Sequence, residues 1–431
     1  MANNNNTKNL NVPNLRFPEF KGEWKKYKVS DILEFFPTNS LSWDQLEYGT
    51  DNIYNLHYGL IHKGLPTQIE LVKCSLPNIK KELIPKNYTL CKDGDVAFAD
   101  ASEDTNDVGK VVEFLSCENK NIICGLHTIH GRDKKNLTIN GFKGYAFSSE
   151  IFRCQIRRLS QGTKIYSISP KNFKDISIGV PSKEEQSKIA ALLWLLDHRI
   201  ANQNKIIEKY ESLIKGIGNK LFSLKMRFKT NDGNDFPSWK TKSFENIGKT
   251  FSGLSGKAKE DFGIGKPYIQ YKQVFDSPQI QIQNCGLVNV SDSENQNNVK
   301  YGDVFFTVSS ETPDEIGMSS VLLDEVDEMY LNSFCFGYRL SSFEVLSPLY
   351  ASYFFRDSSF RNKVVKIAQG STRYNISKSE LIKLEISLPS IEEQARIASF
   401  LSAVDEKIKN EKEILNLYLI QKSYLLRQMF I

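Results

Sequence analysis

The sequence predicts an α+β protein built by internal duplication, with two tandem mixed α/β domains separated by two long antiparallel coiled-coil helices in a pseudo-twofold arrangement. The stretch at 181–222 returns at 389–430, 208 residues later. Both copies space their apolar residues alternately four and three apart, which is typical of a long helix in a coiled coil. Short apolar runs between Gly, Asn, Asp and Pro fill the rest of the chain and predict strands.

The repeat divides the 431 residues into five parts. We expect a disordered N-terminal tail over 1–14 and a first globular domain over 15–180. A central long helix over 181–228 follows. A second globular domain spans 229–388, and a C-terminal long helix spans 389–431. A period of about 200 residues indicates a duplicated domain and excludes a solenoid of short repeats.

Each long helix opens with the same start signal. Ser182 precedes Glu185 by three residues, and Ser390 precedes Glu393 in the same way. This spacing predicts a capping box, in which the serine hydroxyl accepts from a backbone N–H and the glutamate reaches back to the N–H of the cap.

The apolar seam of the two helices predicts that they pack on each other. Gln203 interrupts the first seam and Glu411 interrupts the second, again 208 residues apart, and such a polar position sets the register of a coiled coil. Two unrelated amphipathic helices on separate domains are the alternative, but the seams match position by position. The predicted interface residues are Ile189, Leu193, Leu196, Ile200, Ile207, Ile397, Leu401, Val404, Ile408 and Leu415.

Composition predicts a cytoplasmic protein. No apolar run approaches the roughly 18 residues of a membrane span, and the first residues lack the apolar core of a signal peptide. The seven cysteines include no C-x-x-C pair, which argues against a disulfide or zinc framework. Cys124, His127 and His130 are close in sequence, but no second ligand cluster accompanies them, so we expect no metal site.

Inside the globular domains we expect a central, partly antiparallel sheet with a few helices. The 208-residue offset runs through both domains without a visible gap, and it pairs His127 with Cys335. The runs at 95–99, 111–115, 121–126, 150–159, 303–308, 319–324 and 335–340 predict strands with a few helices among them, and 347–367 predicts helix.

The sequence points away from catalysis on this chain. Asp95 and Asp303 follow a glycine at the start of strands, and further acidic residues follow them. A nuclease would need clustered carboxylates and a lysine around a metal, but Asp100 becomes Val308 in the second copy. A turn role for each Gly-Asp is therefore favoured, and no phosphate-binding loop or catalytic triad recurs in both copies.

Two polar loops before the long helices are the main candidates for nucleic-acid contact. Glycine permits close backbone approach, hydroxyls and amides suit phosphates, and Gln or Arg can also read base edges. A turn that only positions the helix, with its tyrosine packed, is an equally good interpretation. The candidates are Gln161, Gly162, Thr163, Lys164 and Tyr166 in the first copy and Gln369, Gly370, Ser371, Thr372, Arg373 and Tyr374 in the second.

A second candidate DNA surface exists only in the second copy. It comprises Ser252, Lys257, Lys266, Tyr268 and Lys272, which combine hydroxyls, cations and an aromatic ring. The corresponding segment of the first copy, at 38–43, matches it poorly. Such divergence is what two different DNA targets would require.

The duplicated motifs resemble the specificity (S) subunits of type I restriction-modification systems. The resemblance rests on P-S-x-E-E-Q-x-x-I-A at the start of each helix, on an F-P…W lead-in before each domain and on Gln-Gly…Tyr-x-Ile-Ser before each helix. It covers essentially the whole chain beyond residue 12. It implies two target recognition domains, each reading one half of a bipartite, asymmetric site in double-stranded DNA.

The resemblance further implies a non-catalytic subunit whose helix pair sets the spacer and docks two methyltransferase (M) subunits. These would bind S-adenosylmethionine and flip the target adenine out of the stack for N6 methylation. Restriction (R) subunits using ATP and Mg²⁺ would join through them, so no cofactor is expected on this chain. Gly216 and Gly218 inside the first helix put its last turn in doubt.

Two other classes of function compete with a DNA reader. The chain could itself cleave or modify DNA through the acidic residues after Gly94 or Gly302, in which case purified chain with Mg²⁺ would turn over DNA. It could instead be a coiled-coil scaffold that touches no DNA, in which case its binding would show no steep salt dependence.

Overall fold

The computed structural model describes residues 11–431, which form two compact units. Unit 1 comprises residues 11–205 and 413–431, and unit 2 comprises residues 206–412. Most of the tail predicted over 1–14 lies outside the described residues. Within it, Asn11 is ordered by its carbonyl, which accepts from the Trp24 N–H at 2.8 Å. No helix among residues 11–431 has the length and apolarity needed to cross a membrane.

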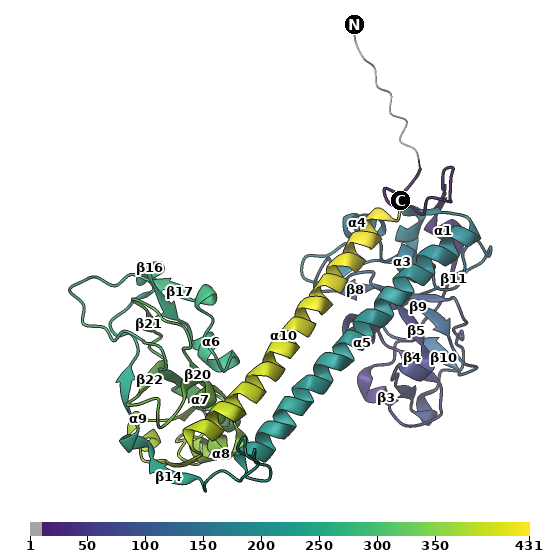
Figure 1. Cartoon of the computed structure of the whole chain (residues 1–431). Helices are drawn as coiled ribbons and strands as arrows, with labels where there is room; N and C mark the ends of the chain where they lie inside the picture. The colour runs from purple at the N-terminus through teal and green to yellow at the C-terminus, as the bar shows by residue number, and fades with distance from the viewer. Residues whose placement is uncertain (1–10) are drawn as a thin grey trace. The chain divides into compact units, whose positions relative to one another are not determined.

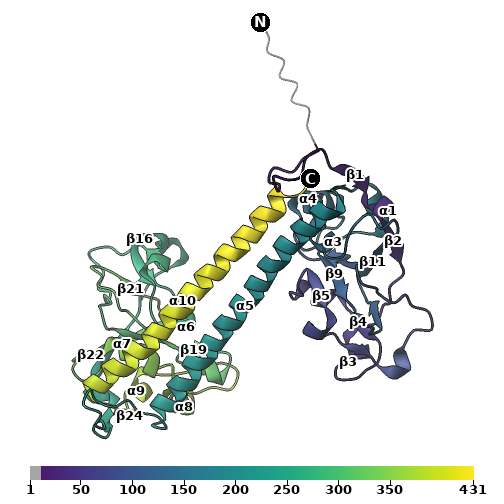
Figure 2. The same ribbon diagram turned by 45° about the vertical axis from the view of Figure 1, so that its right-hand side comes forward.

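Unit 1 contains a five-stranded sheet in the order β2-β11-β7-β9-β5 and a four-stranded sheet in the order β10-β4-β6-β3. Pairs β5/β9 and β10/β4 are parallel and the others antiparallel. Figures 1 and 2 show the sheets beside the first part of α5. The strands are β1 (Lys25–Lys28), β2 (Leu33–Phe36), β3 (Leu46–Glu47), β4 (Tyr54–Leu56), β5 (Gln68–Glu70), β6 (Asn78–Ile79), β7 (Val96–Ala99), β8 (Ala101–Ser102), β9 (Val111–Ser116), β10 (Ile122–Cys124), β11 (Thr128–Asp133), β12 (Tyr166–Ser167) and β13 (Ser177–Val180).

Unit 2 repeats the plan with an antiparallel sheet β15-β22-β18-β20 and a smaller sheet β17-β16-β21. The predicted mixed α+β architecture with partly antiparallel sheets is confirmed. The strands are β14 (Lys240–Ser243), β15 (Gly248–Ser252), β16 (Phe262–Ile269), β17 (Gly286–Val288), β18 (Val304–Thr307), β19 (Ser309–Ser310), β20 (Ser319–Val321), β21 (Tyr330–Leu331), β22 (Cys335–Leu340), β23 (Tyr374–Asn375) and β24 (Glu385–Leu388).

The helices include two of 40 and 38 residues, α5 and α10. Despite Gly216 and Gly218, α5 continues without a break to Phe222. The helices are α1 (Val29–Ile32), α2 (Tyr58–His62), α3 (Lys143–Ala146), α4 (Glu150–Leu159), α5 (Lys183–Phe222), α6 (Tyr271–Asp276), α7 (Pro348–Phe354), α8 (Ser358–Lys366), α9 (Lys378–Leu381) and α10 (Ile391–Gln428).

The structure refines two sequence predictions of local structure. The run at 150–159, one of those predicted as strands with a few helices, is the helix α4, and the Ser149 side chain caps it by accepting from the Phe152 N–H. The helix expected over 347–367 is two helices, α7 and α8, because the chain turns at 355–357 and Asp357 caps a new start.

Strand β7 is buried on both faces, which explains its continuous apolar run. Val96 and Phe98 face a core shared with α3, α4 and the long helices, whereas Ala97 and Ala99 face a second core under α2. In unit 2, Val304 of β18 faces the helices in the same way. In each unit the central strand is therefore packed against an apolar core on both of its faces.

In each unit the beginning of one long helix shares a core with the end of the other. Leu193 of α5 and Leu425 of α10 belong to one core in unit 1, and Leu221 of α5 and Leu401 of α10 belong to one core in unit 2. The structure places the ten seam residues as follows: Ile189, Leu193, Leu196, Ile207, Ile397, Leu401 and Ile408 are buried, and Ile200, Val404 and Leu415 are half-buried.

The capping box forms only in part, because its glutamate has another partner. The Ser182 hydroxyl accepts from the Glu185 N–H at 3.3 Å, as predicted. The Glu185 carboxylate, however, accepts from Arg16 Nε and Nη2, each at 2.7 Å, and from Trp24 Nε1 at 3.2 Å. The motif therefore ties the start of α5 to the lead-in of unit 1.

Unit 2 repeats this tie. Glu393 accepts from Arg227 Nε at 3.0 Å and Nη2 at 2.7 Å, and from Trp239 Nε1 at 3.2 Å. The glutamine of the motif is also used twice, since Gln186 accepts from the Ile139 N–H and Gln394 from the Ser347 N–H, both at 2.9 Å. The P-S-x-E-E-Q motif is thus a packing device that anchors a long helix to a globular fold.

Candidate nucleic-acid interface

The two polar loops predicted from the sequence occupy the same place in each unit. In unit 1, Gln161 and Ser167 exchange backbone hydrogen bonds that close the loop, and β12 pairs with β8. In unit 2, Gln369 and Asn375 close the loop in the same way, and β23 pairs with β19. Each loop is therefore a short turn held against the strand segment that follows the central strand of its sheet.

The glycine of each loop is required by its backbone. Gly162 has φ +140° and Gly370 has φ +120°, and a Cβ on either would meet a carbonyl oxygen, of Ile165 or Arg373, within 2.1 Å. This close approach turns the following side chains outward. Gln161, Thr163, Lys164, Gln369, Ser371, Thr372 and Arg373 are all exposed, whereas Tyr166 and Tyr374 are half-buried against the cores.

Beside each loop lies an exposed residue that was not predicted as a DNA contact: His127 in unit 1 and Phe334 in unit 2. The Asp100 N–H donates to the His127 carbonyl at 3.0 Å, and the Val308 N–H donates to the Phe334 carbonyl at 3.1 Å. His127 therefore corresponds to Phe334, 207 residues later, and not to Cys335. The ungapped 208-residue offset was wrong at this point, because β11 and β22 are displaced by one residue relative to their neighbours.

An aromatic cluster lies beside this surface in unit 1. The Tyr58 ring contacts the His57 and His127 rings, with centroids 4.8 and 5.1 Å apart. His62 Nε2 lies 2.9 Å from the Ala101 carbonyl of β8, the strand that holds the loop. His127 is exposed and His57 is buried, so His127 is the ring of this pair that could stack on a base. The motif Y-G-L-I-H at 58–62 was the only local signal that could have indicated this cluster.

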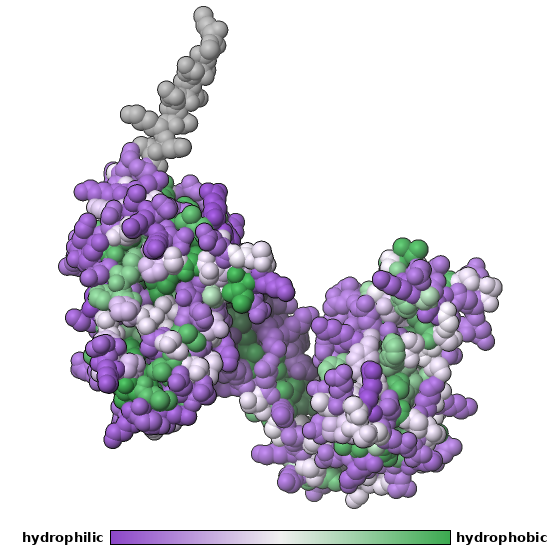
Figure 3. All heavy atoms as spheres, turned by 180° about the vertical axis from the view of Figure 1, so that it is seen from behind, coloured by the Kyte–Doolittle hydropathy of each residue, from purple (hydrophilic) through white to green (hydrophobic). Residues whose placement is uncertain are grey.

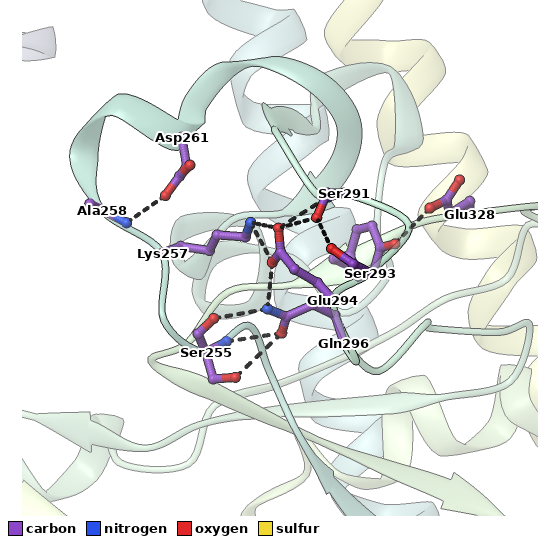
Figure 4. A network of polar contacts seen from close by, with 10 residues as sticks. Ser255, Lys257, Ala258, Asp261, Ser291, Ser293, Glu294, Gln296 and Glu328 are labelled. Atoms are coloured by element: carbon purple, nitrogen blue, oxygen red, sulfur yellow. Dashed lines mark hydrogen bonds and ion pairs between the residues drawn. The ribbon is translucent and has the colours of Figure 1, made fainter.

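The second candidate surface divides into exposed and engaged residues. The Lys257 side chain is 6% exposed and its Nζ lies 2.5 Å from Glu294 Oε2. Figure 4 shows this pair within a polar network that includes Ser255 and Gln296. Tyr268 is buried in a small apolar cluster with Leu254. Both side chains are engaged within unit 2, and DNA contact through them stays a prediction.

The other members of that surface stay candidates for DNA contact. Lys272 is exposed, and Lys266 is exposed but ion-paired with Glu328 at 2.6 Å. Ser252 is exposed, and its hydroxyl accepts from Lys378, a residue that lies just beyond the second loop. Lys378 therefore links the surface around Ser252 to the chain that follows Tyr374.

The Gly-Asp carboxylates are structural. Asp95 accepts from Arg132 Nε at 2.8 Å and from His130 Nε2 at 2.7 Å, and Asp303 accepts from Arg339 Nε at 2.8 Å. Burial raises the pKa of Asp95, but the bonds from Arg132 and His130 outweigh it and hold the pKa below its usual range. Asp303 lacks the histidine, and burial leaves its pKa raised. Both carboxylates are buried and paired with arginine, which supports the predicted turn role over a nuclease site.

The metal-ligating residues are arranged differently from the sequence order. Cys124 and His130 lie together, but the third member of their cluster is Cys91, and His127 points instead to Asp100 with Nδ1 3.0 Å from Oδ1. Cys91 comes 33 residues earlier in the chain, so spacing alone could not associate it with the other two.

Comparison with known proteins places the chain in one family. The model of the type I restriction modification DNA specificity domain matches the chain twice, at residues 21–212 and 228–417. The MjaX specificity subunit of a type I restriction enzyme from Methanocaldococcus jannaschii is 24% identical over 96% of this chain and 97% of its own length. The EcoKI specificity subunit from Escherichia coli is 26% identical over 61% of this chain and 58% of its own length.

Solved structures share the fold. The S subunit of a type I restriction-modification system from M. genitalium superposes with a TM-score of 0.55 at 16% identity, over 97% of this chain and 99% of that one. A chain from a study of assembly in the type I system reaches a TM-score of 0.57 at 16% identity, over 94% and 96% of the two chains.

Proposed function

The chain belongs to the type I restriction-modification DNA specificity family, and we propose that its two domains each read one half of a bipartite, asymmetric DNA site. The long helices set the distance between the half-sites and dock two M subunits. The adenine chemistry, with S-adenosylmethionine, then belongs to the M subunits, and the ATP- and Mg²⁺-dependent steps belong to R subunits that join them.

One observation carries the reading of two half-sites. The loops at 161–166 and 369–374 share a backbone frame, with the same closing hydrogen bonds and the same strand pairing, but they differ in their exposed side chains. A shared frame with different side chains is what two related readers of different sequences need. Lys164 and Arg373 add a cation at the same end of each loop, where either can meet a phosphate or a base edge.

The docking role is supported by apolar side chains that the seam leaves exposed. Leu417 is 63% exposed and Ile420 is 57% exposed on α10, and Leu195 of α5 is 56% exposed. Apolar patches also interrupt the polar surface on the face that Figure 3 draws. Exposed apolar residues grouped along a helix mark protein contacts more often than free surface. M subunits are the partners that the family implies for these exposed side chains of α5 and α10.

Mapping of methylated adenines tests the reading directly. A host that carries this chain with its M subunit is compared with the same host lacking this chain. We expect a new bipartite motif with a fixed gap. An assembled complex that produces no motif would contradict the DNA-reading function and favour a scaffold.

Two matched substitutions test the assignment of the loops. Lys164→Ala is expected to weaken one half-site and Arg373→Ala the other, and each lost phosphate contact lowers the slope of log affinity against log salt by about 1. Assembly with M should be unchanged, because both side chains are exposed outside the helices. Equal loss at both half-sites from either substitution would contradict the assignment.

A further inference from the structure

Three metal-ligating side chains converge in the interior of unit 1. The Sγ atoms of Cys91 and Cys124 lie 3.6 Å apart, and a ring nitrogen of His130 lies within 4.8 Å of both. Their exposures are 5%, 2% and 0%, so none of the three is a surface residue. The cluster is separate from the polar loops at 161–166 and 369–374.

His130 has one nitrogen available for a ligand. Its Nε2 lies 2.7 Å from an oxygen of the Asp95 carboxylate, which accepts hydrogen bonds, so Nε2 carries the hydrogen and donates it. Nδ1 is buried and has no hydrogen-bond partner among the described residues. A histidine that binds a metal through one nitrogen and donates the other N–H to a carboxylate is the usual arrangement in metal sites.

Unit 2 shows that the fold does not require this cluster. Val299 stands 208 residues after Cys91, and the displaced register pairs His130 with Gly337 and Cys124 with Leu331. Val299 and Leu331 are both buried in an apolar core. The second copy therefore has aliphatic side chains in place of the two cysteines and no side chain in place of the histidine, whereas the supporting Asp–Arg pair is present in both units.

We propose that Cys91, Cys124 and His130 bind a Zn²⁺ ion inside unit 1. Two thiolates and one imidazole are zinc ligands, and tetrahedral zinc with bonds of about 2.3 Å sets its sulfurs about 3.8 Å apart, close to the separation observed here. Both thiols lose their protons to solvent on binding, so the site with its metal is electrically neutral and can be buried.

A neighbouring cavity could supply a water as the fourth ligand. A cavity of about 410 Å³ is lined by Thr38, Asn39, Ile123 and Cys124. It is polar enough to hold water, which is the usual fourth ligand where the protein supplies three. Cys124 is the residue that this cavity and the cluster have in common.

The bound zinc would join the two sheets of unit 1. Cys124 ends β10 of the four-stranded sheet, and His130 lies on β11 of the five-stranded sheet. Cys91 precedes β7, and its N–H donates to the Ile122 carbonyl at 2.8 Å. The role of the ion is therefore structural: it fixes the four-stranded sheet beside the recognition surface that carries Tyr58 and His127.

Metal content of the purified full chain tests the proposal. We expect about one zinc per chain, lost in Cys91→Ala and Cys124→Ala and retained in Cys335→Ala, a buried cysteine of unit 2. Co²⁺ bound in place of zinc should show intense sulfur-to-metal charge-transfer absorption with two thiolates per ion. Equal zinc in all four proteins, or none in the wild type after growth with zinc, would overturn the proposal.

A second pair of variants keeps the test valid if the cysteine variants fail to fold. Asp95→Asn is expected to weaken zinc binding by about 10- to 100-fold, because it loosens the histidine ligand. Asp303→Asn removes the same ion pair with arginine in unit 2 and should leave zinc affinity unchanged. Affinity is measured by competition with a chromophoric chelator. A disulfide between Cys91 and Cys124, detected by thiol counting in freshly purified protein, would also overturn the proposal.

Discussion

Replacing the buried ion pair of Glu113 and Lys143 with the residues of the second copy should separate the effect of an unpaired charge from that of a lost pair. Lys143 Nζ lies 3.0 Å from Glu113 Oε1, and the two side chains are 2% and 0% exposed. The same carboxylate accepts from the Gly141 N–H at 2.9 Å and from the Gly144 N–H at 2.7 Å. The corresponding residues of unit 2 are Val321 and Ala351, 208 residues later.

The expected free energies follow from burial. Lys143→Ala or Glu113→Val alone leaves an uncompensated buried charge and should cost about 3–5 kcal/mol each. The double substitution leaves no buried charge but deprives two backbone N–H groups of their acceptor, which should cost about 2–4 kcal/mol in total. The two changes should therefore couple by at least about 2 kcal/mol.

Urea unfolding followed by tryptophan fluorescence reports the free energy of unfolding of unit 1, which contains the ion pair. Three of the four tryptophans (Trp24, Trp43 and Trp194) belong to unit 1. A double variant as unstable as the sum of the two single variants would refute the reasoning, because it would mean that the charges contribute independently of each other.

The position of this pair connects it to the rest of unit 1. Lys143 begins α3, and Tyr145 on the same helix donates to Asp197 of α5 at 2.9 Å. Asp197 also pairs with Lys422 of α10 at 2.5 Å. The single variants should therefore also weaken the attachment of the sheet to the long helices, which faster hydrogen exchange in α3 would reveal.

Three further predictions concern other parts of the chain. Burial, and then the charge of His127, lowers the pKa of His57 to about 4, so the unfolded chain binds the proton first as pH falls below about 6.5. The stability that this group contributes above pH 6.5 is lost as the pH falls towards 4, and the loss is about 3 kcal/mol. His57→Asn should remove that part of the pH dependence. Urea unfolding at pH 7 and at pH 4.5 measures it. Glu185→Gln should destabilise unit 1 by about 2 kcal/mol through its weaker bonds to arginine, and Glu393→Gln should do the same in unit 2; hydrogen exchange resolved by peptide checks that each effect stays in its own unit. Leu417→Lys should reduce co-purification of the M subunit while leaving the melting temperature within about 1 °C, and unchanged assembly would exclude this side chain from the docking face.

The long helices and the duplication could be predicted from the sequence because their signals are local. Ser182, the seam from Ile189 onward and the acidic first turn each act within a few residues, and the second copy repeats them. The role of the loop glycines could also be predicted from the sequence, because glycine permits a close approach of the backbone. The structure agrees: Gly162 and Gly370 both have positive φ, which disfavours any side chain.

The errors arose where local signals were ambiguous or where register mattered. The run at 150–159 is rich in apolar residues, but its Ser149 cap and the spacing of Phe152 and Ile156 are helical, and α4 follows them. The offset between the two copies changes from 208 to 207 residues at β11, and the amino-acid composition gives no sign of this change. It became visible only through strand pairing, which showed that His127 corresponds to Phe334.

The sequence by itself determined that this is a duplicated, two-domain chain joined by long helices, because a repeat of this length and a continuous apolar seam allow few other arrangements. Only the tertiary structure decided which side chains are free. Lys257 and Tyr268 have the composition of a DNA surface, yet the fold uses one in an ion pair and buries the other. Cys91 lies 33 residues before Cys124 in the sequence, and the assembly of the sheets brought it beside Cys124 and His130. Availability and proximity depend on contacts between residues far apart in the chain, and these contacts form only when the sheets assemble.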